Sequence, residues 1–209
     1  MKAHTKETQA TMTPARSLQE LKDGNARFQN NLKTERDLMG QVSDTSQGQF
    51  PFATVLSCID SRVSSELIFD QGIGDIFSVR IAGNFVNEDI LGSMEFACKL
   101  AGTKLLVVLG HTACGAVKGA CDHAEMGNLT KLIEKLTPAV NAVTSPKEAD
   151  ARTSANIDFV NNVAEMNVTM TIDRIVAESD ILAEMQNNGE IKIIGGMYDI
   201  NTGSVQFFE

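Results

Sequence analysis

The chain has 209 residues, is 43% hydrophobic and carries a formal net charge of −9. That length and apolar fraction suffice for one domain with a proper core but are short for two. An acidic chain without a basic cluster is a poor partner for nucleic acid. No apolar run reaches the roughly 18 residues of a membrane span, and the polar N-terminus lacks the apolar stretch of a signal peptide. We therefore expect a cytoplasmic protein that binds neither nucleic acid nor membrane.

Residues 1–16 are polar and show no hydrophobic periodicity, so we expect a flexible N-terminal arm followed by a single domain over residues 17–209. Ser17 and Glu20 have the spacing of a capping box, which predicts that a helix begins there. Strands and helices are expected to alternate, and this order predicts a mostly parallel sheet with right-handed crossovers. Besides the runs described next, the expected strands are 75–81, 190–194 and 204–208, and the expected helices are 64–69, 87–100, 113 onward and most of 129–187.

Two short apolar runs each end in polar, metal-binding residues. The first leads into Cys58-Ile59-Asp60-Ser61-Arg62, and the second, at 104–109, leads into His111-Thr112-Ala113-Cys114-Gly115. This pattern is typical of buried parallel strands that end in functional loops. In open α/β sheets, ligands bind outside the carboxyl ends of the strands. If the two runs are neighbouring strands, one edge of the sheet carries Cys58, Asp60, Arg62, His111 and Cys114.

The residue types at this edge suit a catalytic zinc ion. Two thiolates and one imidazole are typical zinc ligands, and three protein ligands leave one tetrahedral position open. Arg62 can hold Asp60 in a bidentate pair, which keeps the carboxylate ionised and away from the metal. Without Arg62, Asp60 could become a fourth ligand and close the site. The alternative interpretation is an ordinary surface ion pair, which contributes little.

Three further residues carry two interpretations each. Cys98 and Cys121 fall in expected helices among small and apolar neighbours, so we interpret them as buried small hydrophobic residues. The alternative is a disulfide between them, which the sequence does not exclude. His123 is interpreted as a surface histidine, with proton transfer as the alternative role.

These motifs resemble those of the β-class carbonic anhydrases, in which Cys-x-Asp-x-Arg is followed downstream by His-x-x-Cys. The resemblance continues through 74–84, covers most of residues 17–124 and resumes at 195–199. It implies an α/β fold with four parallel strands, an antiparallel fifth and flanking helices. It also implies a homodimer or homotetramer, and reversible hydration of carbon dioxide to bicarbonate and a proton by zinc-bound hydroxide.

The resemblance extends to candidate substrate-binding residues. Gln49 stands where related enzymes place a glutamine that hydrogen-bonds the substrate, and Phe77 and Ala82 match positions that line the apolar carbon dioxide pocket. Phe96 stands where a tyrosine often occurs, so any hydroxyl contact there is lost. The amide of Gly115 is a plausible donor to bicarbonate. In relatives, some of these groups cross the dimer interface.

Some members of this family carry an inhibitory bicarbonate site that uses a tryptophan three residues before the first cysteine ligand. Here that position is Val55, which has no N–H group, although Arg80 matches another part of the site. We therefore expect the subgroup without this site, with Asp60 paired to Arg62. Two other functions stay open: a carbon disulfide or carbonyl sulfide hydrolase on the same scaffold, and a non-catalytic protein whose structural zinc is closed by Asp60. The intact Arg62 argues against the second.

Overall fold

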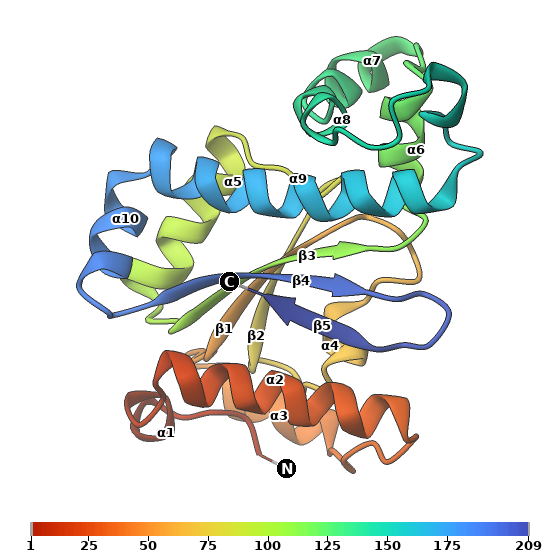
Figure 1. Cartoon of the computed structure of the whole chain (residues 1–209). Coiled ribbons are helices and arrows are strands. Elements are labelled where there is room, and N and C mark those ends of the chain that lie inside the picture. The colour runs from red at the N-terminus through yellow and green to blue at the C-terminus, as the bar shows by residue number, and fades with distance from the viewer. Residues whose placement is uncertain (1, 209) are drawn as a thin grey trace.

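A five-stranded sheet forms the centre of the computed structural model, which describes residues 2–208 (Figure 1). The order across the sheet is β2-β1-β3-β4-β5; the first four strands are parallel, and β5 runs antiparallel to β4. The expected fold class is therefore confirmed. The strands are β1 (Ala53–Ser57), β2 (Ile76–Arg80), β3 (Leu105–His111), β4 (Lys192–Tyr198) and β5 (Val205–Phe208).

Strands β1 and β3 are buried along their whole length, as expected for central parallel strands with near-continuous apolar sequences. Their register pairs Ser57 with Leu109, so the two strands end side by side. Cys58 directly follows β1, and His111 is the last residue of β3. The backbone topology of the sheet alone thus brings the two motifs to the same edge.

Helices cover both faces of the sheet (Figure 1). One face carries α2 and α3, while α9 runs across the other, with α5 and α10 at one end and α6 to α8 at the other. The helices are α1 (Lys6–Ala10), α2 (Pro14–Gln29), α3 (Leu38–Thr45), α4 (Ser65–Ile68), α5 (Glu88–Glu95), α6 (Gly115–Cys121), α7 (Gly127–Glu134), α8 (Thr137–Ala142), α9 (Ile157–Glu178) and α10 (Asp180–Asn187); a π-helical turn (Phe96–Leu100) continues α5, and a 3-10 turn (Ala149–Ala151) precedes α9.

The N-terminal stretch differs from the expected flexible arm. Thr5 caps α1 within it, Met12 is buried, and the side-chain amide of Gln9 donates hydrogen bonds to the carbonyls of Pro51 and Ala101. These contacts tie residues 2–13 to the domain through single polar and apolar residues, and a search for apolar periodicity does not detect isolated contacts of this kind. Met1 and Glu209 lie outside the described residues.

The first long helix also begins earlier than predicted. The cap of α2 is Thr13, with Pro14 at the first helical position, whereas Ser17 lies buried inside the helix and its hydroxyl donates to the carbonyl of Phe52. The predicted capping box at Ser17 is therefore wrong. Proline is well placed at the first helical position, because the missing N–H has no partner there. The Thr-Pro pair was the stronger signal.

The four cysteines are free and buried, which confirms the interpretation of Cys98 and Cys121 as small hydrophobic residues and contradicts the disulfide alternative. His123 is exposed, with a left-handed backbone conformation just after α6. Among residues 2–208, none of the helices combines the length and the apolarity that a membrane crossing requires.

Candidate metal centre

Three side chains from two strand ends converge on one buried point. Cys58 follows β1, His111 ends β3, and Cys114 caps the N-terminus of α6. Their ligand atoms all lie within 4.8 Å of one another, and the three residues are at most 4% exposed. The structure therefore confirms that the two motifs meet.

The arrangement fits a tetrahedral zinc ion. Two sulfurs that each lie about 2.3 Å from such an ion are about 3.8 Å apart. The Sγ atoms of Cys58 and Cys114 are 4.0 Å apart. Nδ1 of His111 lies 3.0 Å from the carbonyl oxygen of Thr112, which is an acceptor, so Nδ1 carries the ring proton. Nε2 is buried without a hydrogen-bond partner among the described residues, and a metal ion is the partner that its lone pair lacks.

The two thiols are strongly coupled. A hydrogen bond from the Cys114 thiol lowers the pKa of the Cys58 thiol, and the adjacent His111 ring and the Gly83 amide act in the same direction. The same pairing with Cys58, together with burial, raises the pKa of the Cys114 thiol. The protein groups alone thus favour one thiolate and disfavour two. A divalent cation removes that penalty, because metal binding requires both sulfurs as thiolates.

The backbone around Cys58 is shaped by Gly83. Its amide donates to the Cys58 sulfur over 3.4 Å, and its φ of +78° lies in the left-handed region. A Cβ at this position would lie 2.7 Å from Cδ1 of Leu136. Only glycine can adopt this left-handed conformation freely and also leave room for the Leu136 side chain. Gly83 lies within the stretch that resembles the family, but its contact with the metal centre was not predicted.

Asp60 and Arg62 form the predicted bidentate ion pair next to the metal ligands. Nε of Arg62 lies 2.9 Å from Oδ1 of Asp60, and Nη2 lies 2.7 Å from Oδ2; the Arg62 amide also donates to Oδ1 over 3.0 Å. Hydrogen bonds from the guanidinium hold the pKa of the Asp60 carboxyl well below its usual range. Asp60 therefore stays ionised and accepts hydrogen bonds only.

Arg80 fixes the loop that carries this pair. Its Nε donates to the carbonyl of Cys58 over 3.0 Å, and its Nη2 donates to the carbonyl of Asp60 over 2.7 Å. A loop that holds both a metal ligand and the paired carboxylate is thus anchored to the end of β2. These bonds occupy two of the nitrogens through which Arg80 could bind an anion.

The residues matched to substrate binding do not all gather at the metal ligands within one chain. The rings of Phe77 and Phe96 meet edge to face with centroids 6.3 Å apart, in a groove of about 730 Å³ along β2 and α5. The lining of this groove does not include the three metal ligands. Gly115 begins α6 directly after Cys114, Ala82 is half-buried in the loop after β2, and Gln49 is exposed before β1.

Two asparagines of α9 that were not predicted as site residues contact the loops of this centre. Asn161 accepts a hydrogen bond from the Ala113 amide, and Asn167 donates one to the Gly83 carbonyl. A buried amide within the otherwise apolar face of a helix was the available signal. It shows that a partner is required, but it does not identify which loop supplies that partner.

Comparisons with known proteins agree with this geometry. A family model described as carbonic anhydrase matches residues 53–205. A carbonic anhydrase of Mycolicibacterium smegmatis is 35% identical over 200 residues, which cover 92% of each chain. Carbonic anhydrase 2 of Mycobacterium tuberculosis is 32% identical over 196 residues, which cover 91% of this chain and 90% of that one.

Solved structures show the same fold. The β-carbonic anhydrase CcaA aligns with a TM-score of 0.70 at 24% identity, covering 92% of this chain and 87% of that one. A structure from a report on two tetrameric β-carbonic anhydrases of Sordaria macrospora aligns with a TM-score of 0.69 at 22% identity, covering 93% and 94%.

Proposed function

Because the chain belongs to the β-class carbonic anhydrase family, whose activity is the reversible hydration of carbon dioxide to bicarbonate and a proton, we propose that Cys58, His111 and Cys114 hold a zinc ion for this reaction. Membership of the family makes the protein a carbonate dehydratase, a lyase. The observation that supports zinc is the convergence of two sulfurs and one unpartnered imidazole nitrogen in a buried site. Thiolate and imidazole ligands in tetrahedral arrangement favour zinc over harder divalent cations.

When bound, zinc supplies hydroxide near neutral pH by lowering the pKa of a water ligand. The protein then has to aim that nucleophile, and Asp60 is the residue placed to do so. An ionised carboxylate cannot donate a proton, so Asp60 would accept a hydrogen bond from the O–H group of the nucleophile and thereby orient it towards carbon dioxide. Arg62 keeps Asp60 in this role, because both carboxylate oxygens accept bonds from the guanidinium.

The same ion pair disfavours a closed, structural zinc site. A carboxylate that reaches the metal would have to leave Arg62, and three hydrogen bonds from that residue hold it in place. Arg80 adds a second restraint through the carbonyls of Cys58 and Asp60. We assign Asp60 and Arg62 the catalytic roles on these contacts.

We further propose that the substrate pocket is completed by a second copy of the chain in a homodimer or homotetramer. Its residues are Gln49, Phe77, Ala82, Phe96 and the amide of Gly115. Phe77 belongs to β2, which is an edge strand of the sheet, and the ring of Phe96, which is 50% exposed, packs against it. Aromatic rings left open beside an unpaired strand edge are typical of surfaces that another chain covers. The reported tetramers of Sordaria macrospora belong to the same fold.

The chain is also proposed to belong to the subgroup without an inhibitory bicarbonate site. Val55, where that site requires a tryptophan, is fully buried within β1 and offers no donor. Arg80 is engaged with two carbonyls. A ligand shifts an equilibrium only by its differential affinity for the two states, and these residues give bicarbonate little to favour the closed state. A cytoplasmic location is proposed from the four free cysteines, which suit a reducing compartment.

The decisive experiment is a stopped-flow measurement of carbon dioxide hydration on zinc-loaded protein, with metal content determined on the same sample. Arg62→Ala should keep its zinc and lose at least about tenfold in kcat, because Asp60 is no longer held in the accepting position. Arg174→Ala is the matched control, since Arg174 forms a similar 2.9 Å pair with Glu178 on the exposed side of α9. Parental turnover in Arg62→Ala would contradict the role given to the pair, and hydration no faster than in buffer by the parent would refute the function.

A further inference from the structure

Helix α9 lies unusually close to the strand that delivers His111. A Cβ at Gly110, the residue before His111, would lie 2.7 Å from Cγ2 of Val168 and 3.6 Å from the carbonyl oxygen of Ala164. Glycine at this position therefore allows α9 to pack against the very end of β3 (Figure 1). Two asparagines at and near this contact, Asn161 and Asn167, reach the loops beyond the strand ends.

Asn161, on the N-terminal side of the contact, reaches the loop between His111 and Cys114. Its Oδ1 accepts a hydrogen bond from the Ala113 amide over 2.9 Å. Ala113 has a φ of +53°, a left-handed conformation that is unfavourable for alanine. Such strain persists only where the surroundings enforce it. The bond from Asn161 supports the conformation that sets the distance between His111 and Cys114.

Asn167, which lies between Ala164 and Val168 on the helix, reaches the loop next to the third ligand, Cys58. It is 4% exposed, and its Nδ2 donates to the carbonyl of Gly83 over 2.8 Å. The amide of the same glycine donates to the sulfur of Cys58. Asn167 therefore fixes the residue that solvates one of the two thiolates.

We propose that Asn161 and Asn167 are positioning residues through which α9 holds both halves of the metal centre in place. Each acts through one loop residue, Ala113 for Asn161 and Gly83 for Asn167, and so affects a different ligand. The inference rests on the proposed zinc centre. It goes beyond it by assigning part of the zinc affinity to a helix that contributes no ligand.

The test measures zinc affinity by competition with a chromophoric chelator, together with urea unfolding of the metal-free proteins. Hydrogen-bond partners of metal ligands typically contribute tenfold to a hundredfold to affinity; since Asn161 and Asn167 act through one intervening loop residue, Asn161→Ala and Asn167→Ala are each expected at the lower end, a loss of about tenfold. Asn162→Ala is the matched control, because Asn162 is exposed on the same helix. A purely structural role would lower the stability of the metal-free variants while leaving zinc affinity unchanged.

The opposite hydrogen-bonding roles of the two asparagines give a sharper comparison. Asn161 accepts, so Asn161→Asp keeps the bond and should retain zinc affinity within about threefold. Asn167 donates, so Asn167→Asp removes the bond and should bind zinc as weakly as Asn167→Ala. Glycine adopts a left-handed conformation freely, so adding Ala113→Gly should remove most of the loss caused by Asn161→Ala. An equal loss from Asn161→Ala with and without Ala113→Gly would overturn the role of Asn161.

Two results would overturn the inference as a whole. One is zinc affinity within about twofold of the parent in both alanine variants, measured against the tenfold loss expected. The other is measured on the parent protein. Hydrogen exchange of the Ala113 amide should be slow, because this amide donates to Asn161. Exchange at the rate of an unstructured peptide would show that this hydrogen bond is absent. A parent that binds no zinc would instead refute the metal centre itself.

Discussion

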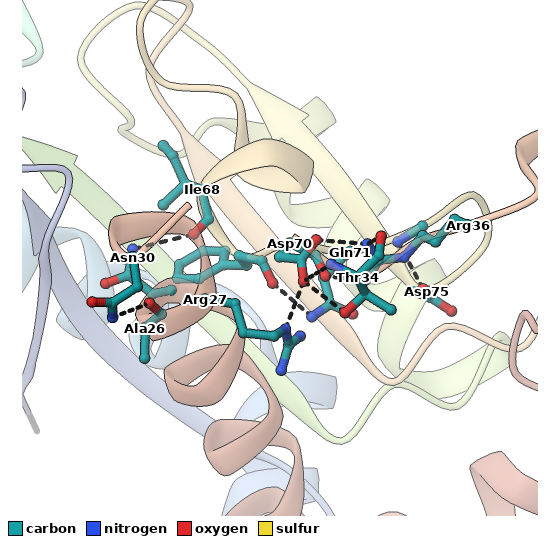
Figure 2. Close-up of polar contacts among 12 residues, drawn as sticks. Ala26, Arg27, Asn30, Thr34, Arg36, Ile68, Asp70, Gln71 and Asp75 are labelled. Carbon is teal, nitrogen blue, oxygen red and sulfur yellow. Dashed lines mark hydrogen bonds and ion pairs between the residues drawn. The ribbon is translucent and has the colours of Figure 1, made fainter. Parts of the chain in front are cut away.

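Replacing Asp70 with asparagine should destabilise the protein by about 2 to 3 kcal/mol at neutral pH. Asp70 lies just after α4, is 4% exposed and has a left-handed backbone with φ of 46°. Figure 2 shows the side chains that surround it. Nε of Arg27 lies 2.6 Å from Oδ2, Nη1 of Arg36 lies 2.6 Å from Oδ1, and the amide and hydroxyl of Thr34 donate to Oδ2.

The magnitude follows from the pKa of the carboxyl group. Burial alone would raise the pKa of Asp70, but the bonds from Arg36, Arg27 and Thr34 outweigh burial and lower it from 3.8 to about 2. Each pKa unit corresponds to about 1.4 kcal/mol, which gives about 2 to 3 kcal/mol. Solvent screens this interaction little, because the Asp70 side chain is only 3% exposed, so the full value applies. The loss of the charge partner of Arg36, whose side chain is 8% exposed, is already contained in this value, because neutral Asp70 and asparagine both leave the guanidinium without it.

The pH dependence has a definite sign. Because the folded-state pKa is lowered, the contribution is fully present above the unfolded value of 3.8 and is lost as the pH falls towards about 2. The difference in unfolding free energy between parent and Asp70→Asn should therefore stay constant from pH 7 to about pH 5 and shrink below about pH 4. Loss of zinc in acid affects both proteins alike and cancels in this difference.

Urea unfolding of both proteins across this pH range measures the effect, with Asp173→Asn on the exposed side of α9 as the control, expected within about 0.5 kcal/mol of the parent. A difference below about 1 kcal/mol at neutral pH would refute the reasoning, since it is less than half of the value that linkage gives. So would a difference that does not change in acid, because it would then arise from packing and not from charge.

Three further outcomes test the proposed function. Cys58→Ser should bind far less zinc than the parent by elemental analysis, because it lacks one of three ligands; full retention would refute the ligand set. The parent should sediment and scatter light as a dimer or larger, and a fully active monomer would contradict a pocket shared between copies. Activity should fall gradually below neutral pH with bicarbonate acting as a simple product inhibitor; a steep, cooperative loss deepened by bicarbonate would show that the closed state is reached by another route.

The ligands of the metal centre could be predicted because their signals are local. Each apolar strand ends in its own motif, and the rule that parallel strands end at one edge brings Cys58 and His111 together. The bidentate pair of Asp60 and Arg62 was equally local, since the partners lie two positions apart in sequence. The mostly parallel sheet was predicted from the alternation of strands and helices, and the antiparallel fifth strand from the family resemblance; the order of the strands was not predicted.

The rest depended on contacts between distant segments. Asn167 and Gly83 lie 84 positions apart, and no pattern within α9 names the loop that its asparagines reach. The N-terminal stretch was misjudged for a related reason, because Gln9 is tied to Pro51 and Ala101 by polar groups and not by an apolar stripe. Periodicity reports which side of an element is buried, but not which backbone groups a buried amide will satisfy.

The backbone around the metal centre shows why such contacts are needed there. Gly83, Asn84 and Ala113 all have positive φ values, of 78°, 39° and 53°, and they lie in the two loops that carry or contact the ligands. Glycine adopts this conformation freely and asparagine tolerates it, whereas alanine does not, so Ala113 is the residue that its surroundings must hold. For Ala113 the structure shows the restraint, which is the side chain of Asn161. A centre whose loops are held in this way meets the metal with its ligands already placed, and preorganisation of this kind reduces the entropy that binding has to overcome.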